Sequence, residues 1–374
     1  MPASSDELMP SVPQRILELD GFRSLAVWMV FVSHMVKGWP HSGADLAWIP
    51  SWMVRILDHG WLGVDLFFLL SGLLITGILI DTRPEPRYFS KFYARRSLRI
   101  LPLYFVCIVL MYWGYPGYGS YFLASLLFVQ NFVFAFGIAV PHGPGVFWSL
   151  AVEEHFYLLW PWLVRFVSNR VVLLSAVVIV LVTPVLRGIF TGLGYDLDGE
   201  IYVYSWFRFD TLALGAILAL WIRSPLFHRA FAHRLAASFA AAFFIITVIG
   251  YPFGILRAQT IASGALRYVQ VECIFASLMV LALAYKGSRY TALLRHPFAI
   301  FSAGLSYCIY LIHLTVGDMY YWILHRLHVD ELASFGLSGS LFVRTAFVFG
   351  ASIGLAWLSQ RYLEAPFLRL KRYF

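Results

Sequence analysis

Residues 61–80 read WLGVDLFFLLSGLLITGILI, a run of twenty residues in which Asp65 is the one ionisable side chain. About 20 consecutive apolar residues form a helix long enough to cross the roughly 30 Å hydrocarbon core of a bilayer. Comparable runs recur along the chain, which has 374 residues and is 60% hydrophobic and 13% charged. The sequence therefore predicts an all-α protein, a polytopic bundle of membrane-spanning helices.

The apolar runs predict ten transmembrane helices and one segment that enters the bundle without crossing. The helices are expected at residues 20–36, 61–80, 98–115, 147–164, 171–190, 205–222, 236–253, 268–285, 298–316 and 341–363. Residues 121–136 are expected to be re-entrant or interfacial. If this segment does not cross the membrane, most Lys and Arg residues lie on the inner side, as the positive-inside rule requires. If it crosses, these residues are divided about evenly between the two sides.

This arrangement predicts one membrane domain with both termini in the cytoplasm. Residues 1–19 form the expected cytoplasmic N-terminal tail, 20–364 the transmembrane domain and 365–374 the cytoplasmic C-terminal tail. The first twenty residues lack the pattern of a signal peptide. The net charge of +8 is attributed to cytoplasmic loops that face anionic lipid, so membrane lipids rather than nucleic acid are the expected partners.

The three cysteines offer no sign of a disulfide framework or a metal site. Cys107, Cys273 and Cys308 each lie inside an apolar run, without a second Cys or a His at the spacing that zinc sites use. We interpret them as packing residues, because an unpaired Cys behaves as a small hydrophobic side chain. No bound metal is expected.

Charged residues within the spans are the first indication of function, since a charge at the bilayer centre costs about 3 kcal/mol on insertion scales. Arg23 and His34 are eleven residues apart on the first predicted helix. This separation corresponds to a rotation about 20° beyond three full turns and to a rise of about 16 Å. The two side chains therefore share a face at different depths. Each alone could instead extend to lipid headgroups or bond a neighbouring helix.

Carboxylates occur at the depth predicted for His34. Asp65 lies about one turn into the second span, where it could orient the imidazole for general-base chemistry, or simply cap the start of its helix. Glu153 and Glu154 lie in the second turn of the span at 147–164. Because adjacent helical residues point about 100° apart, one of the two is expected to face the bundle interior.

A basic segment precedes the third span. In FYARRSLRILPLY, residues 92–104, Arg95 and Arg99 are four residues apart and share a face, with Arg96 beside them. Guanidinium groups match phosphate oxygens in bidentate geometry, so this group could bind phosphates. The alternative is that the basic residues only follow the positive-inside rule.

Three further ionisable residues lie within spans, namely Arg208, Asp210 and His313. Each has a structural interpretation, as an ion pair inside the bundle or a hydrogen-bonded core histidine. Together with His34 and Asp65 they predict an ionisable layer in the outer half, above the arginines on the inner side. The alternative function is a proton- or ion-coupled secondary transporter, in which this layer relays ions.

The chain resembles the acyltransferase-3 family of membrane O-acyltransferases. Seven blocks carry the resemblance: ELDGFRSLAVWMVFVSHM, GVDLFFLLSGLLIT, FYARRSLRILPLYF, FWSLAVEEHFYLLWP, RFDTLALGA, LSYCIYLIHL and YLEAPF. The Arg-x10-His pair of the family falls on Arg23 and His34, and its Arg-Arg-x-x-Arg motif falls on Arg95, Arg96 and Arg99. Glu153 is the preferred member of its pair on the same grounds.

The resemblance implies transfer of an acyl group, by default acetyl, from cytoplasmic acyl-CoA to a hydroxyl of an envelope glycan or lipid-linked sugar at the bacterial inner membrane. His34 is expected to act as general base, oriented by Asp65 or Glu153. The CoA phosphates, those of a substrate rather than a bound cofactor, are expected on Arg95, Arg96 and Arg99, assisted by Arg23. The chain departs from the family pattern in two ways. Thr315 stands where family members often carry a proline soon after the histidine that corresponds to His313, and no SGNH-type hydrolase domain is expected after the last span.

Overall fold

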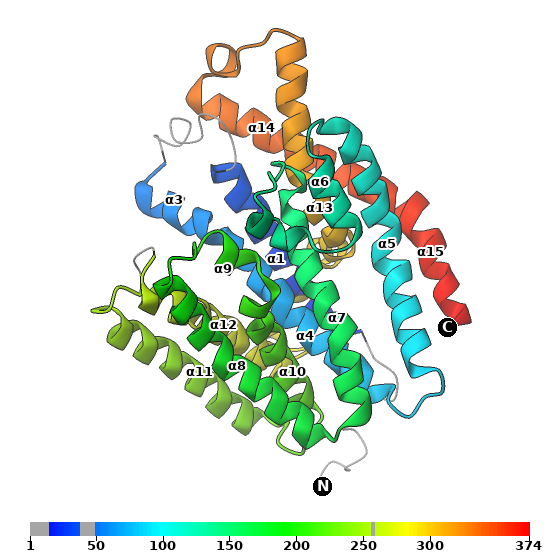
Figure 1. The fold of residues 1–374 in the computed structure, drawn as a ribbon, viewed down its shortest axis with the longest axis vertical. Coiled ribbons are helices and arrows are strands. Elements are labelled where there is room, and N and C mark those ends of the chain that lie inside the picture. The colour runs from blue at the N-terminus through cyan, green and yellow to red at the C-terminus, as the bar shows by residue number, and fades with distance from the viewer. Residues whose placement is uncertain (1–14, 38–48, 256–258) are drawn as a thin grey trace.

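The computed structural model describes residues 15–37, 49–255 and 259–374, and within these ranges every regular element is a helix (Figure 1). This confirms the predicted all-α class. The long helices are α1 (Leu17–Lys37), α4 (Gly63–Asp81), α5 (Tyr88–Gly114), α7 (Trp148–Phe166), α8 (Asn169–Gly192), α10 (Phe209–Ile222), α11 (Arg229–Gly250), α12 (Ile261–Ala284), α13 (Pro297–Arg326) and α14 (Glu331–Leu358).

Short helices connect or extend the long ones. They are α3 (Ser51–Asp58), η2 (His59–Leu62), α6 (Gly119–Leu126), η3 (Gln130–Phe136), η4 (Pro144–Phe147), α9 (Glu200–Val203), η5 (Ser205–Phe207), η6 (Arg289–Thr291), η7 (Leu293–Arg295), η8 (Ser359–Glu364), α15 (Ala365–Arg369) and η9 (Leu370–Tyr373).

Each of the ten predicted spans overlaps one of the long helices. Seven helical stretches in the described ranges are long and apolar enough by themselves to cross a membrane. The remaining spans correspond to α1 and α7, which carry ionisable residues, and to α10, which has 14 residues. Residues 365–374, predicted to be a tail, continue as α15 and η9 beside α5 (Figure 1).

Residues 121–136 do not form a continuous helix. The chain breaks between α6 and η3, where Phe128 has a left-handed backbone with φ 56°. Gln130 is buried and donates to the main-chain oxygen of Phe147 at 2.7 Å, and Asn131 is buried and donates to Ser205 Oγ at 2.9 Å. A segment that buries its polar side chains against protein fits the re-entrant interpretation, since lipid offers them no hydrogen-bond partner.

Helices α4 and α10 approach each other main chain to main chain. A Cβ atom added at Gly72 would lie 1.9 Å from the Leu212 oxygen, and one added at Gly215 would lie 2.2 Å from the Leu69 oxygen. No side chain larger than hydrogen fits at either position without moving a helix. The glycines therefore set the spacing of this helix pair at the centre of the bundle.

Helix α5 lies at the edge of the bundle beside α15 (Figure 1). Its first half carries the arginines of the basic segment, and Pro102 follows Arg99 by three residues. Proline has no amide hydrogen to donate, so the helical hydrogen bond to residue 98 is missing there. Further along, Val109 and Leu110 are 57% and 66% exposed, as expected of side chains that face lipid.

Candidate functional site

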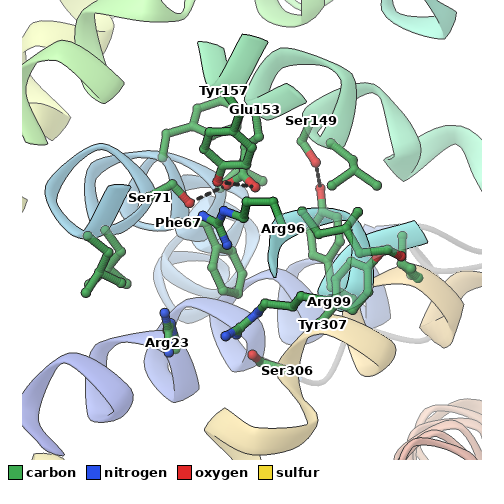
Figure 2. Close-up of a pocket in the computed structure, with 18 residues that line it drawn as sticks. Arg23, Phe67, Ser71, Arg96, Arg99, Ser149, Glu153, Tyr157, Ser306 and Tyr307 are labelled. Atoms are coloured by element: carbon green, nitrogen blue, oxygen red, sulfur yellow. Dashed lines mark hydrogen bonds between the residues drawn. The ribbon is translucent and has the colours of Figure 1, made fainter. Parts of the chain in front are cut away.

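A cavity of about 110 Å³ lies between α1, α4, α5, α7 and α13 (Figure 2). It is lined by Arg23, Val64, Phe67, Phe68, Leu70, Ser71, Leu74, Arg96, Arg99, Ile100, Ser149, Leu150, Glu153, Tyr157, Ser306, Tyr307, Tyr310 and Leu311. Three guanidinium groups, one carboxylate and six hydroxyl groups therefore share a wall that is otherwise apolar. We call this space the donor cavity, after the guanidinium and hydroxyl hydrogen-bond donors that line it.

The three arginines of the donor cavity come from two helices (Figure 2). Arg23 projects from α1 and bonds Asp20 Oδ1 through Nη1 at 3.1 Å. Arg96 and Arg99 project from α5, where a spacing of three residues places them on one face. The Arg96 guanidinium lies 4.4 Å from the ring centroid of Tyr157, a cation–π contact that holds its plane.

Arg95 is not part of this group, which corrects the predicted fork of Arg95 and Arg99. Its side chain is exposed, and Nη2 donates to the main-chain oxygen of Phe374 at 3.0 Å. The reason is the way α5 packs: the face with Arg96 and Arg99 turns toward α1 and α7, so Arg95 faces the C-terminal segment. Spacing along a helix showed which residues share a face but not which face is turned inward.

Glu153 lies in the donor cavity and not beside His34. It accepts hydrogen bonds from Ser71 at 2.5 Å and from Tyr157 at 3.0 Å, and Arg23 and Arg96 are in its electrostatic environment. The predicted use of Glu153 to orient the imidazole of His34 is therefore not what the structure shows. Both oxygens of Glu153 are taken by these two hydroxyl donors.

His34 instead pairs with His313, and the partners of His313 define which nitrogen carries each hydrogen. His313 Nδ1 lies 3.0 Å and 2.9 Å from the main-chain oxygens of Ile309 and Tyr310, so it must donate. In neutral His313 the lone pair is then on Nε2. His34 Nδ1 lies 2.8 Å from that atom and donates to it. The lone pair of His34 therefore lies on Nε2, as a general base requires.

Asp65 lies in a second group of charges, away from His34, which corrects the pairing predicted from depth. Asp65 and Arg208 form an ion pair, and Arg187 Nη1 lies 2.6 Å from Asp210 Oδ2. All four side chains have 0% exposure. Arg208 and Asp210 therefore pair across helices, with partners on α4 and α8, and not with each other. We call this group, with Glu272, the buried charge cluster.

Glu272 completes the buried charge cluster from α12. It is 2% exposed and accepts a hydrogen bond from Thr211 Oγ1 at 2.8 Å. Arg208 also lies 4.3 Å from the ring centroid of Tyr268. Sequence analysis missed Arg187 and Glu272, although each, like Asp65, is the single charge in its span. A count of opposite charges across the spans is the signal that could have paired Arg187 with Asp210.

The donor cavity ends just short of the histidine pair. Within the described part of the chain, neither imidazole is among the lining residues. Tyr310 contacts both the cavity and the pair, because it lines the cavity and its main-chain oxygen accepts from His313 Nδ1. Its hydroxyl lies 2.7 Å from Ser149 Oγ. The arginines and the histidines are thus joined through Tyr310.

Sequence analysis also missed Ser149 and Tyr157 as cavity residues. Both are four residues from Glu153 on α7, so the three form a stripe on one helix face. This spacing could have been recognised from FWSLAVEEHFY. The three cysteines are buried, and the described residues contain no group of His, Cys, Asp and Glu that could hold a metal.

Comparison with known proteins found one matching family model and several similar proteins. A family model described as an acyltransferase domain, acyltransferase-3, matches residues 16–361. The peptidoglycan O-acetyltransferase OatA of Listeria monocytogenes is 29% identical over 229 residues, which cover 54% of this chain and 33% of that protein. The O-acetyltransferase OatA of Staphylococcus aureus is 27% identical over 227 residues, which cover 55% and 35%.

The chain spans about a third of the length of these two curated relatives. No solved structure matches it. The family model, by contrast, covers nearly the whole chain and includes the donor cavity, the histidine pair and the buried charge cluster. The protein therefore belongs to the acyltransferase-3 family.

Proposed function

We propose that this protein transfers an acyl group, acetyl by default, from cytoplasmic acyl-CoA to a hydroxyl group of an envelope glycan. The observation that carries the proposal is the order of groups along the bundle. Arginines line the donor cavity, and Tyr310 connects its wall to the His34–His313 pair. A phosphorylated donor would bind at the first site, and the reactive end of its arm would extend toward the second.

The arginines support the choice of an acyl-CoA donor. Arg96 and Arg99 project from one helix face and Arg23 faces them from α1 (Figure 2). Bidentate bonds from guanidinium to phosphate oxygens are charge-assisted and therefore stronger than neutral hydrogen bonds. In our proposal the CoA phosphates bind these three side chains at the mouth, and the apolar wall from α4 and α13 receives the pantetheine arm.

The histidine pair supports the choice of general-base catalysis. His34 Nε2 takes the proton of the acceptor hydroxyl, and the acceptor oxygen forms a bond to the thioester carbonyl carbon. The carbon–sulfur bond then breaks, and the CoA thiolate leaves and takes up a proton. An alternative order first forms acyl-His34 and releases CoA, after which the acceptor oxygen attacks that intermediate.

The two named relatives support the acceptor class, because they are called a peptidoglycan O-acetyltransferase and an O-acetyltransferase. We therefore propose a glycan of the cell envelope as acceptor. The proposed location is the bacterial inner membrane, with both termini cytoplasmic, because that orientation puts the arginine side of the donor cavity where acyl-CoA is made.

The test is transfer of labelled acetyl from acetyl-CoA to peptidoglycan fragments by purified protein in detergent. We expect native protein to label the glycan and His34→Ala to lose most of that activity. Label on the protein itself, found at His34 by mass spectrometry, would select the two-step order. A secondary transporter, the alternative function, would show no transfer in detergent, where no ion gradient exists. Absence of transfer by native protein would therefore reject the proposal.

A further inference from the structure

Two hydroxyl groups on the wall of the donor cavity bond each other. Ser149 Oγ lies 2.7 Å from Tyr310 Oη. The same hydroxyls lie 3.2 Å and 3.3 Å from the main-chain oxygen of Val146. The two hydroxyl hydrogens therefore have two acceptors, the Val146 carbonyl oxygen and the oxygen of the other hydroxyl group. One of the two hydrogens is bound to another hydroxyl oxygen and not to a carbonyl or a carboxylate.

The other hydroxyl groups on the cavity wall are held more strongly. Each donates to a carboxylate or to a main-chain carbonyl: Ser71 and Tyr157 to Glu153, Ser306 to Ala303, and Tyr307 to Ile100. A bond to a carboxylate is charge-assisted and costly to exchange. A hydroxyl hydrogen can rotate toward a new acceptor, so the Ser149–Tyr310 contact is the one that an arriving carbonyl oxygen could exchange most easily.

The position of this hydroxyl pair relates it to the reaction. Tyr310 and His313 are three residues apart on α13, a rise of about 4.5 Å. The Tyr310 main-chain oxygen accepts from His313 Nδ1, and His313 Nε2 accepts from His34. The Tyr310 and His313 ring centroids are 6.2 Å apart. A carbonyl bound by the Tyr310 hydroxyl would therefore be held by the residue that joins the cavity wall to the histidine pair.

We propose that Ser149 and Tyr310 bind the thioester carbonyl oxygen of the donor and stabilise the negative charge that it acquires during transfer. This inference rests on the proposed function and assigns two residues to it. As the acceptor oxygen adds to the carbonyl carbon, the C=O electron pair moves to oxygen, and the hydrogen shared by the two hydroxyls turns to that atom. When the carbon–sulfur bond breaks, the pair returns to form the ester carbonyl.

This assignment predicts a specific kinetic signature. Removing one donor from an oxyanion-binding site typically lowers kcat by about 10² to 10³. We therefore expect Tyr310→Phe and Ser149→Ala each to lower kcat by about 10², because each keeps the shape of the wall but removes a hydroxyl. Binding of S-ethyl-CoA, a thioether without a carbonyl, should change less than about twofold, because this ligand offers no oxygen to the pair.

The experiment measures CoA release from acetyl-CoA in the presence of chitopentaose, together with the S-ethyl-CoA dissociation constant, on purified full-length protein. The matched control is Tyr88→Phe, which removes a buried hydroxyl that donates to Pro161 at the interface of α5 and α7, outside the donor cavity. We expect Tyr88→Phe to keep native kcat. His34→Ala, run in parallel, tests the proposed function separately.

Each result is decisive. The inference is overturned if Tyr310→Phe and Ser149→Ala keep kcat within about threefold of native while His34→Ala is inactive, and the proposed function then stands. It is also overturned if S-ethyl-CoA affinity falls in step with kcat, since the hydroxyls would then only hold the wall in shape. If one variant does not fold, the other decides. If native protein releases no CoA, the proposed function fails and this inference fails with it.

Discussion

His34 Nδ1 and His313 Nε2 lie 2.8 Å apart, and the direction of this hydrogen bond is set by the main-chain oxygens that His313 Nδ1 faces. A histidine thus occupies the position where many catalytic histidines have a carboxylate. Because His313 is 1% exposed and held by its own helix, it presents one acceptor atom in a fixed place. We infer that its role is to position His34 and not to contact the acceptor.

The first prediction concerns this positioning role. His313→Leu removes the acceptor for His34 Nδ1–H and should lower kcat by about 10² or more, whereas His313→Gln, whose amide oxygen can accept, should restore part of the rate. The KM for acyl-CoA should stay near native in both variants, since His313 does not line the donor cavity. Steady-state kinetics with both substrates varied would check this. Equal loss in the two variants would argue against positioning through a hydrogen bond.

The second prediction separates the arginines. Arg96→Ala and Arg99→Ala should each weaken acyl-CoA binding by about 10-fold to 100-fold, since a hydrogen bond to a charged group contributes about 1.5–3 kcal/mol. Arg95→Ala should bind acyl-CoA like native protein, because Arg95 faces Phe374 and not the cavity. Isothermal titration with acetyl-CoA measures all three. A loss in Arg95→Ala equal to that in Arg99→Ala would contradict the assignment of the cavity.

The third prediction concerns the buried charge cluster. Arg208→Ala leaves the fully buried Asp65 without its partner and should destabilise the fold by about 3–5 kcal/mol. Glu272→Gln should cost far less. The cluster holds three carboxyl groups and two guanidinium groups, and Glu272 bonds a hydroxyl, so its carboxyl is the one that charge balance leaves protonated. An amide can replace a neutral acid.

Thermal unfolding in detergent, followed by tryptophan fluorescence, measures this contrast. The expected order of melting temperatures is native, then Glu272→Gln close below it, then Arg208→Ala far lower. Should Glu272→Gln melt as low as Arg208→Ala, the carboxyl would carry a charge that the cluster needs, and the charge count would be wrong.

The fourth prediction tests the close approach of α4 and α10. Gly72→Ala would place a methyl group 1.9 Å from the Leu212 oxygen, so the helices must separate and folded protein should be lost. Gly350→Ala is the matched control, since a Cβ at this helical glycine meets no atom within 4 Å. Ala is favoured over Gly inside a helix by about 0.5–1 kcal/mol, so this variant should be at least as stable as native. Yield of monodisperse protein in size-exclusion chromatography compares the two.

The sequence predicted the architecture more completely than the site. Runs such as 61–80 locate a helix because apolar length is a property of the segment itself. The assignment of Arg23 and His34 to one helix face depended on the same local geometry. Both residues occupy α1, and the structure connects their surroundings through the donor cavity and Tyr310.

Contacts between helices could not be predicted in this way. Asp65 and His34 have similar depth, but depth leaves the rotation of each helix undetermined, and α4 turns Asp65 toward Arg208 on its neighbour. The same uncertainty misplaced Arg95 and Glu153. Tyr310 carried no charge and therefore gave no signal at all, although it joins the cavity wall to the histidine pair.

Pro102 has a mechanical consequence for how substrate enters. Helices α4 and α10 are tightly packed, because their backbones are in contact at Gly72 and Gly215. The first half of α5, with Arg96 and Arg99, is attached to the rest of that helix through a turn that lacks one hydrogen bond. Bending of α5 at Pro102 would move both guanidinium groups outward together, while α4 and α10 on the opposite side keep their packing. Substrate would then enter the cavity past α5.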